Sequence, residues 1–226
     1  MDMQMTNRVP DWLTPVAWLF ISLAILAAVA IAFDIYARRH RHHTVAAELV
    51  WIASALYLGP FALLVYAKYG RSPVQPGSGT AEADAQPAAV AGLPGGGASA
   101  VAHLIGVPLV IASGLTIAGI NLWVMIIVIA VLAMSFLFVY ERTASRHGRV
   151  GAMPLGAAAI AAVATVLAFD IGMGGWMLLL HFNELMPAAT DGSFWFLMQI
   201  GIVLGVITGY PVVKWLSRRH DSVVHA

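Results

Sequence analysis

The stretch of sequence that decides the fold is VAHLIGVPLVIASGLTIAGINLWVMIIVIAVLAMSFLFVY, residues 101–140, an apolar run without Asp, Glu, Lys or Arg. As one continuous helix it would be roughly 60 Å long, at about 1.5 Å per residue. The hydrocarbon core of a bilayer is only about 30 Å thick. We therefore expect two transmembrane helices in a tight hairpin, residues 101–120 and 122–140, with Asn121 between them.

The rest of the chain has a similar composition. Of its 226 residues, 60% are hydrophobic and 10% are charged, whereas soluble domains carry about 25% charged residues. Four more apolar segments, residues 12–36, 45–66, 154–180 and 194–216, are each long enough to cross a bilayer. The prediction is an all-α fold, a polytopic transmembrane bundle of six helices in contact with the lipid bilayer. Five helices remain an alternative if residues 101–140 cross only once.

The composition also excludes several functions. The formal net charge is +1, so nothing favours nucleic acid as a partner. The chain has no cysteine, which excludes disulfides, cysteine zinc sites, thiolate catalysis and iron–sulfur ligation. It contains no G-x-x-x-x-G-K-[ST], H-E-x-x-H or G-x-S-x-G motif. An enzyme is therefore the least favoured of the functional classes.

A stretch rich in Gly, Pro and Ala divides the sequence into two parts. Residues 70–99, GRSPVQPGSGTAEADAQPAAVAGLPGGGAS, have no periodic apolar face, and we expect a flexible linker. The predicted domains are an N-terminal transmembrane helix pair at residues 1–69, this linker, and a C-terminal four-helix transmembrane domain at residues 100–226. Pro60 predicts a kink in the second helix because proline lacks a backbone N–H.

The Lys and Arg residues bear on orientation, because cytoplasmic loops carry an excess of them. Six crossings put nine of these residues on one side and three, at residues 38–41, on the other. This arrangement places both termini in the cytoplasm and the chain in the cytoplasmic membrane, with no cleavable signal peptide. If residues 101–140 cross once, the split is again nine to three, with the N-terminus outside. The count alone leaves both topologies open.

Ionisable and sulfur-containing side chains interrupt the fifth apolar segment, in FDIGMGGWMLLLHFNEL at residues 169–185. On a helix with 100° per residue, Asp170, Met173, Met177 and His181 lie within a sector of about 80°. Thioethers and imidazoles are ligands for Cu(I), and an ionisable residue inside a membrane indicates a functional site or a buried partner. Together with Met198 from the neighbouring helix, these residues form the predicted metal site, and copper is the favoured ion.

The sixth apolar segment indicates how helices associate. Gly201, Gly205 and Gly209 form a G-xxx-G-xxx-G face, where another backbone can approach closely. We expect this face to pack against the fifth helix. An alternative function follows, a non-catalytic scaffold or accessory subunit that docks a membrane partner or a second copy through these glycines. A proton-coupled transporter using Asp170 is a third possibility, but no inverted repeat supports it.

Several stretches resemble a known family. AFDIGMGGWM at residues 168–177 and FWFLMQIGIVLGVITGYPVVKWL at residues 194–216 resemble the bacterial polytopic membrane proteins catalogued as domain of unknown function four-three-nine-six. FDIY and VWIASALYLGPFALLVY in the first two helices are similar as well. The family carries a motif like H-C-x-x-G-C-x-L-G-D, of which this chain keeps His103, with Leu104 and Pro108 at the cysteine positions. The resemblance implies a membrane topology but no established activity.

Overall fold

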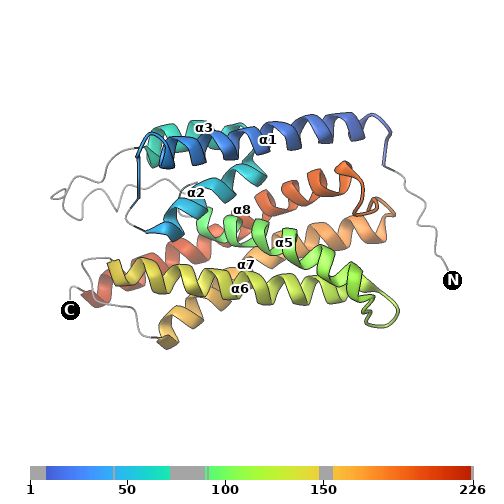
Figure 1. Ribbon diagram of the computed structural model, residues 1–226. Helices are drawn as coiled ribbons and strands as arrows, with labels where there is room; N and C mark the ends of the chain where they lie inside the picture. Colours follow the sequence, from blue (N-terminus) through green and yellow to red (C-terminus); the bar gives the residue numbers. More distant parts are fainter. Residues whose placement is uncertain (1–8, 43, 72–89, 91, 148–154, 225–226) are drawn as a thin grey trace.

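The computed structural model describes residues 9–42, 44–71, 90, 92–147 and 155–224, and these residues form an all-helical bundle (Figure 1). The elements are α1 (Leu13–Tyr36), α2 (Val45–Leu58), α3 (Phe61–Val65), the π-helix η1 (Tyr66–Gly70), α5 (Leu93–Ser113), α6 (Asn121–His147), α7 (Leu155–Phe182) and α8 (Gly192–Val224). In the described part of the chain, five helices are long and apolar enough to cross a membrane: α1, α5, α6, α7 and α8. Their outward faces carry large apolar side chains such as Leu26, Ile160 and Ile171, as contact with lipid requires. The predicted polytopic all-α bundle is confirmed.

The stretch at residues 101–140 forms two antiparallel helices, as its length predicts. The turn between them lies at residues 114–120, earlier than expected, because Gly114 ends α5 in the left-handed region with φ +64°. Ile117 and Ile120 then exchange two backbone hydrogen bonds, at 3.1 and 3.0 Å, and close the turn before Asn121 begins α6. The alternative in which this stretch crosses once does not apply.

The predicted second crossing, residues 45–66, is wrong. Helix α2 ends at Leu58, and Gly59 has φ +58°, a left-handed conformation that favours glycine. Pro60 follows, and it has no N–H to continue the helix. The chain therefore reverses direction instead of kinking, and α3 and η1 return toward the end of the bundle where α2 began (Figure 1).

Contacts between the end of η1 and the residues before α2 confirm the reversal. The hydroxyl of Tyr66 in η1 donates to Asp34 Oδ2, in the last turn of α1, at 3.1 Å. His42, which precedes α2, lies 2.9 Å from the carbonyl oxygen of Gly70 through its Nε2. Residues 45–70 thus enter and leave the bundle at the same end, and we call them the re-entrant hairpin. Five crossings remain, because this hairpin takes the place of the sixth.

Helix α5 begins at Leu93, inside the stretch predicted as a linker. Leu93 is buried, with 3% of its surface exposed, and Pro94 occupies the first turn, where a missing N–H has no cost. Gly96 lies against the ring of Tyr57 and Gly97 against Ala53, so small residues here serve close packing on α2. The linker prediction is therefore wrong for residues 93–99, whereas residues 72–89 and 91 lie outside the described residues.

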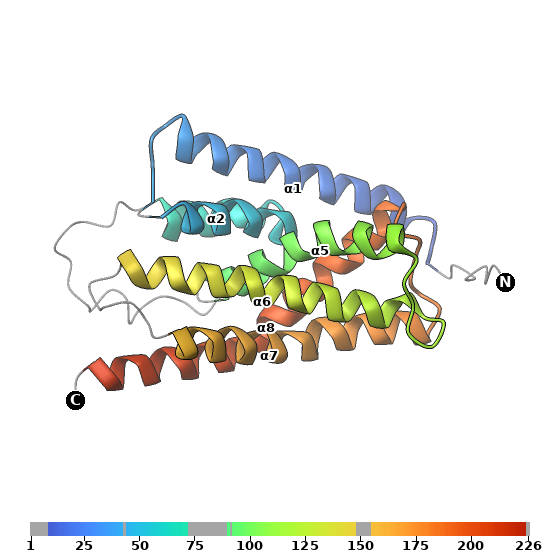
Figure 2. The same cartoon turned by 60° about the horizontal axis from the view of Figure 1, so that its bottom comes forward.

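All Lys and Arg residues in the described part of the chain lie at one end of the bundle, where α1, α6 and α8 end. They are Arg38, Arg39, Arg41, Lys68, Arg71, Arg142, Arg146, Lys214, Arg218 and Arg219. Helix α1 begins at the opposite end, and α8 finishes at the charged end (Figures 1 and 2). Five crossings separate the two ends of the chain, so the prediction of two cytoplasmic termini, which required six, does not fit this arrangement.

Candidate functional site

The glycine face of α8 lies against α7, which it approaches closely. A Cβ on Gly205 would lie 2.6 Å from the ring of Phe169, and one on Gly201 would meet the sulfur of Met173. Gly209 lies against the backbone of Phe169. We call this contact the α7–α8 seam. Because α7 of the same chain covers these three glycines, a separate partner has no access to them.

The structure does not bring all the predicted metal-site residues into one place. Met173, Met177 and Met198 are buried, with at most 2% of their surface exposed. Asp170, in the second half of α7, and His181, in its last turn, are partly exposed. Among the described residues, no group of three or more His, Asp or Glu side chains could hold a metal ion. The structure therefore brings the thioethers into the core, and it places Met198 in the wall of a cavity.

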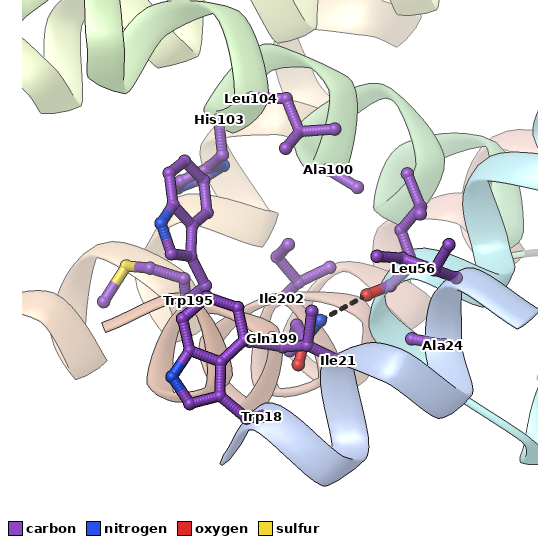
Figure 3. A pocket seen from close by; sticks show the side chains of 12 residues that line it. Trp18, Ile21, Ala24, Leu56, Ala100, His103, Leu104, Trp195, Gln199 and Ile202 are labelled. Carbon is purple, nitrogen blue, oxygen red and sulfur yellow. Dashed lines mark hydrogen bonds between the residues drawn. The ribbon is translucent and has the colours of Figure 1, made fainter. Parts of the chain in front are cut away.

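This cavity has a volume of about 280 Å³ and lies between α1, the tip of the re-entrant hairpin, α5 and α8 (Figure 3). Its walls are mostly apolar, and the side chains that matter for its chemistry are Trp18, Leu56, His103, Trp195, Met198 and Gln199. A concave apolar site with a few polar groups is the usual form of a ligand-binding pocket.

His103 lies inside this cavity with only 2% of its surface exposed. Its Nδ1 is 2.8 Å from the carbonyl oxygen of Ser99, one turn earlier in α5. A carbonyl only accepts, so Nδ1 carries the proton and Nε2 presents a lone pair. Nε2 is buried and has no hydrogen-bond partner in the described part of the chain. The backbone thus fixes the tautomer that makes His103 an acceptor.

Gln199 supplies a second acceptor. Its Nε2 donates to the carbonyl oxygen of Leu56 at 2.7 Å, which joins α8 to the hairpin tip (Figure 3). In a continuous helix this carbonyl would accept from residue 60, but Pro60 has no N–H. The amide oxygen Oε1 of Gln199 is left buried and, within the described residues, without a partner.

The cavity opens sideways, toward the lipid. Trp18, Ile25 and Leu104 line it and are also about half exposed on the outer surface of α1 and α5. Trp195 is held in place because its indole N–H donates to the Ala189 carbonyl at 3.0 Å. The indole nitrogens of Trp18 and Trp195 point away from Gln199 (Figure 3). The indoles therefore present apolar ring surface to the cavity.

At the other end of the hairpin, charged side chains attach it to the last turn of α1 and to the connection that follows α1. Asp34 accepts hydrogen bonds from Arg71 Nη2 at 2.9 Å and from the Tyr66 hydroxyl. Glu48 is fully buried and accepts from Arg41 Nε at 2.6 Å. We call these five residues the clasp. The hydrogen-bonded carboxylates raise the pKa of Arg71 and of Arg41 above the ordinary value, so both guanidinium groups stay charged.

Comparison with known proteins identifies the family. The family model described as "Domain of unknown function (DUF4396)" matches residues 86–221, which is more than half of the chain. The chain belongs to this family. The match spans α5 to α8 and leaves out α1 and the re-entrant hairpin. No curated protein and no solved structure matches the chain.

In this DUF4396 protein, the cavity contains Met198 from the predicted metal site, together with residues that the sequence pattern does not assign to a site. His103 lies in the cavity wall rather than at the predicted stripe. A lone histidine and a lone glutamine within apolar spans are the signals that point to the site, because the bilayer penalises polar side chains. Trp18 and Trp195 give no such signal, since tryptophan near the end of a membrane helix is typical of the membrane–water interface.

Proposed function

We propose that this protein binds a small membrane-soluble molecule that carries hydrogen-bond donors, in the cavity beside His103. The observation that carries the proposal is a pair of buried acceptors, His103 Nε2 and Gln199 Oε1, which have no partner among the described residues and belong to side chains that line one cavity. A buried acceptor without a partner costs about 1–3 kcal/mol. A ligand that donates to these atoms removes that cost, while the apolar walls bind its hydrocarbon part.

The position of the opening supports a ligand that arrives through the lipid. The cavity meets the outer surface at Trp18, Ile25 and Leu104, on faces that contact acyl chains in a membrane. A hydrophilic molecule would lose its hydration on this route, whereas an amphiphile with an apolar tail would not. The ligand is therefore expected to partition into the bilayer before it binds.

A direct test is the binding of 4-decylphenol, which has one hydroxyl donor and an apolar tail, to the full-length protein in nanodiscs. Saturable binding above that of empty nanodiscs is expected, and His103→Leu should weaken it about tenfold, the value of one hydrogen bond. His181→Leu is the matched control, because its Nδ1 is also buried without a partner among the described residues but lies outside the cavity. Equal loss in the two variants, or no saturable binding, would overturn the proposal.

A second candidate function is Cu(I) binding at Asp170, Met173, Met177, His181 and Met198. It is favoured by the three buried thioethers, which are soft ligands. The test is anaerobic Cu(I) titration of the detergent-purified protein beside the triple variant Asp170→Ala, Met177→Leu, His181→Ala. Copper near one equivalent that is lost in the variant would support the metal site, and equal binding by both proteins would rule it out.

For orientation, we propose that the charged end of the bundle faces the cytoplasm and that α1 starts on the other side. The ten described Lys and Arg residues at that end support it, because positive residues are retained in the cytoplasm. The scaffold alternative needs another surface than Gly201, Gly205 and Gly209, since α7 covers these.

A further inference from the structure

We propose that the ligand of the His103 cavity is a long-chain hydroquinone, an aromatic ring with two hydroxyl groups and a hydrocarbon tail. This inference rests on the proposed function and names the chemical class that fits it best. Three properties of the cavity carry it: two acceptors on separate helices, two indole rings in the walls, and an opening to the lipid.

The two acceptors match a molecule with two donors. His103 is on α5 and Gln199 on α8, so the two residues line the cavity from different helices (Figure 3). The hydroxyl groups of a 1,4-hydroquinone stand at opposite ends of its ring, and each is a donor. A ligand with one hydroxyl leaves either His103 Nε2 or Gln199 Oε1 unpaired, and an unpaired buried acceptor is costly.

The walls and the volume match an aromatic ring. Trp18 and Trp195 line the cavity with their indole rings, which stack with aromatic ligands. An apolar cavity of about 150 Å³ is sufficient for benzene. The space of about 280 Å³ therefore holds a substituted ring, and the tail extends into the lipid past Leu104 and Ile25.

The same geometry discriminates between redox states. Oxidation of a hydroquinone to the quinone turns both hydroxyl donors into carbonyl acceptors. Acceptors would then face the lone pairs of His103 Nε2 and Gln199 Oε1, and the amide nitrogen of Gln199 is already bonded to Leu56. The cavity is therefore expected to hold the reduced form at least tenfold more tightly than the oxidised form.

The experiment compares four ligands on the unmodified protein in nanodiscs under anaerobic conditions: 2-decyl-1,4-hydroquinone, its dimethyl ether, 2-decyl-1,4-benzoquinone and 4-decylphenol. Bound ligand is extracted and quantified against empty nanodiscs. The hydroquinone should bind with a stoichiometry near one, about tenfold more tightly than the phenol, and the ether and the quinone should bind weakest. His103→Leu should reduce hydroquinone binding about tenfold, and His181→Leu should not.

The outcomes separately test the hydroquinone assignment, recognition through hydrogen-bond donors and the proposed function. If the phenol binds in a His103-dependent manner but the hydroquinone binds no tighter, the hydroquinone assignment fails and the proposed function stands. If the ether or the quinone binds as well as the hydroquinone, recognition through donors is wrong. If no ligand binds in a saturable manner, both the assignment and the proposed function fail. The four-ligand comparison does not depend on whether His103→Leu folds.

Discussion

The α7–α8 seam and the attachment of the re-entrant hairpin differ in the contacts that hold the helices together. At the seam, glycines let one backbone lie directly on the other helix, so that a Cβ on Gly172 would lie 2.6 Å from the Leu204 carbonyl oxygen. The hairpin packs on Gly96 and Gly97 of α5 as well, but polar side chains also hold it, through the clasp at one end and through Gln199 at its tip. The His103 cavity lies not at this seam but beside Gln199, where a long side chain of α8 reaches across to the hairpin tip.

This contrast explains why the candidate site lies beside the hairpin. A break in a membrane helix exposes backbone groups, and they are tolerated only where protein or a cavity satisfies them. Here Pro60 leaves the Leu56 carbonyl without its helical donor, and a polar side chain has to reach it from α8. Gln199, which supplies this polar group, also lines the cavity, and this is the physical link between hairpin and site.

The largest expected effect concerns the hairpin as a topological element, and it is all or none. The chain has no cysteine, so single-cysteine variants can be labelled without background. Arg39→Cys and Lys68→Cys should react with a membrane-impermeant maleimide from the same face, because the hairpin returns to its starting side. Asn183→Cys, an exposed position between α7 and α8, should react from the opposite face.

The control for this labelling is Ala55→Cys, at a fully buried position that should stay unlabelled from both faces. A crossing by residues 45–66 would separate positions 39 and 68, and it would place position 39 on the same side as position 183. Reaction of Arg39→Cys and Asn183→Cys from one face, with Lys68→Cys reacting from the other, would therefore contradict the re-entrant hairpin.

The next effect is expected at the clasp. Arg41→Met leaves the fully buried carboxylate of Glu48 without its cation, and an uncompensated buried charge is strongly destabilising. The double variant Arg41→Met, Glu48→Met should recover most of the lost thermal stability, since it removes both charges. Arg38→Met is the control, because Arg38 is 60% exposed and its ion pair with Asp34 is worth little. A double variant less stable than Arg41→Met would contradict this account.

Much of the fold follows from the sequence, because apolar length is a property of single segments. The run at residues 101–140 is too long for one crossing, and the structure divides it into α5 and α6. The glycine spacing of α8 predicts the contact with α7 in the same local way. The reversal at Gly59 does not follow from the sequence, since the residues around Pro60 are compatible with either a kink or a turn.

The candidate site depends on side chains that lie far apart in the sequence, and this is why the sequence points to the stripe on α7 and not to the cavity. Helical periodicity places Asp170, Met173, Met177 and His181 on one sector, and that relation needs only one helix. The cavity needs the register between α5, α8 and the hairpin tip. No pattern within a single segment predicts that Gln199 donates a hydrogen bond to Leu56, 143 positions away.

A smaller effect tests the seam. Gly172→Ala places a Cβ against the backbone of α8, which cannot move aside as a side chain can, and overpacking of this kind costs about 1–3 kcal/mol. Gly175→Ala is the matched control on the same helix, because a Cβ there meets nothing within 4 Å. Thermal unfolding in detergent should show a loss for Gly172→Ala and none for Gly175→Ala. Equal behaviour of the two variants would show that the helices are not in close backbone contact.

The smallest effect tests the bond between α8 and the hairpin tip. Gln199→Leu removes the donor to the Leu56 carbonyl, and an unsatisfied buried carbonyl costs about 1–3 kcal/mol. Part of this loss is offset, because the variant also removes the buried Oε1, which has no partner in the described part of the chain. We therefore expect a net loss near the lower limit, about 1 kcal/mol, measured by thermal unfolding in detergent.

Thr208→Val on the same helix is the control for this substitution, because the Thr208 hydroxyl bonds only to carbonyls of its own helix among the described residues. Its loss should be smaller than that of Gln199→Leu. Proteolysis sharpens the comparison: opening of the hairpin in Gln199→Leu should speed cleavage after Lys68 or Arg71, whereas damage at the seam by Gly172→Ala should not do so at the same loss of stability. Equal cleavage rates in those two variants would mean that hairpin and seam unfold as one unit. The two modes of attachment would then not differ in the free energy of local opening.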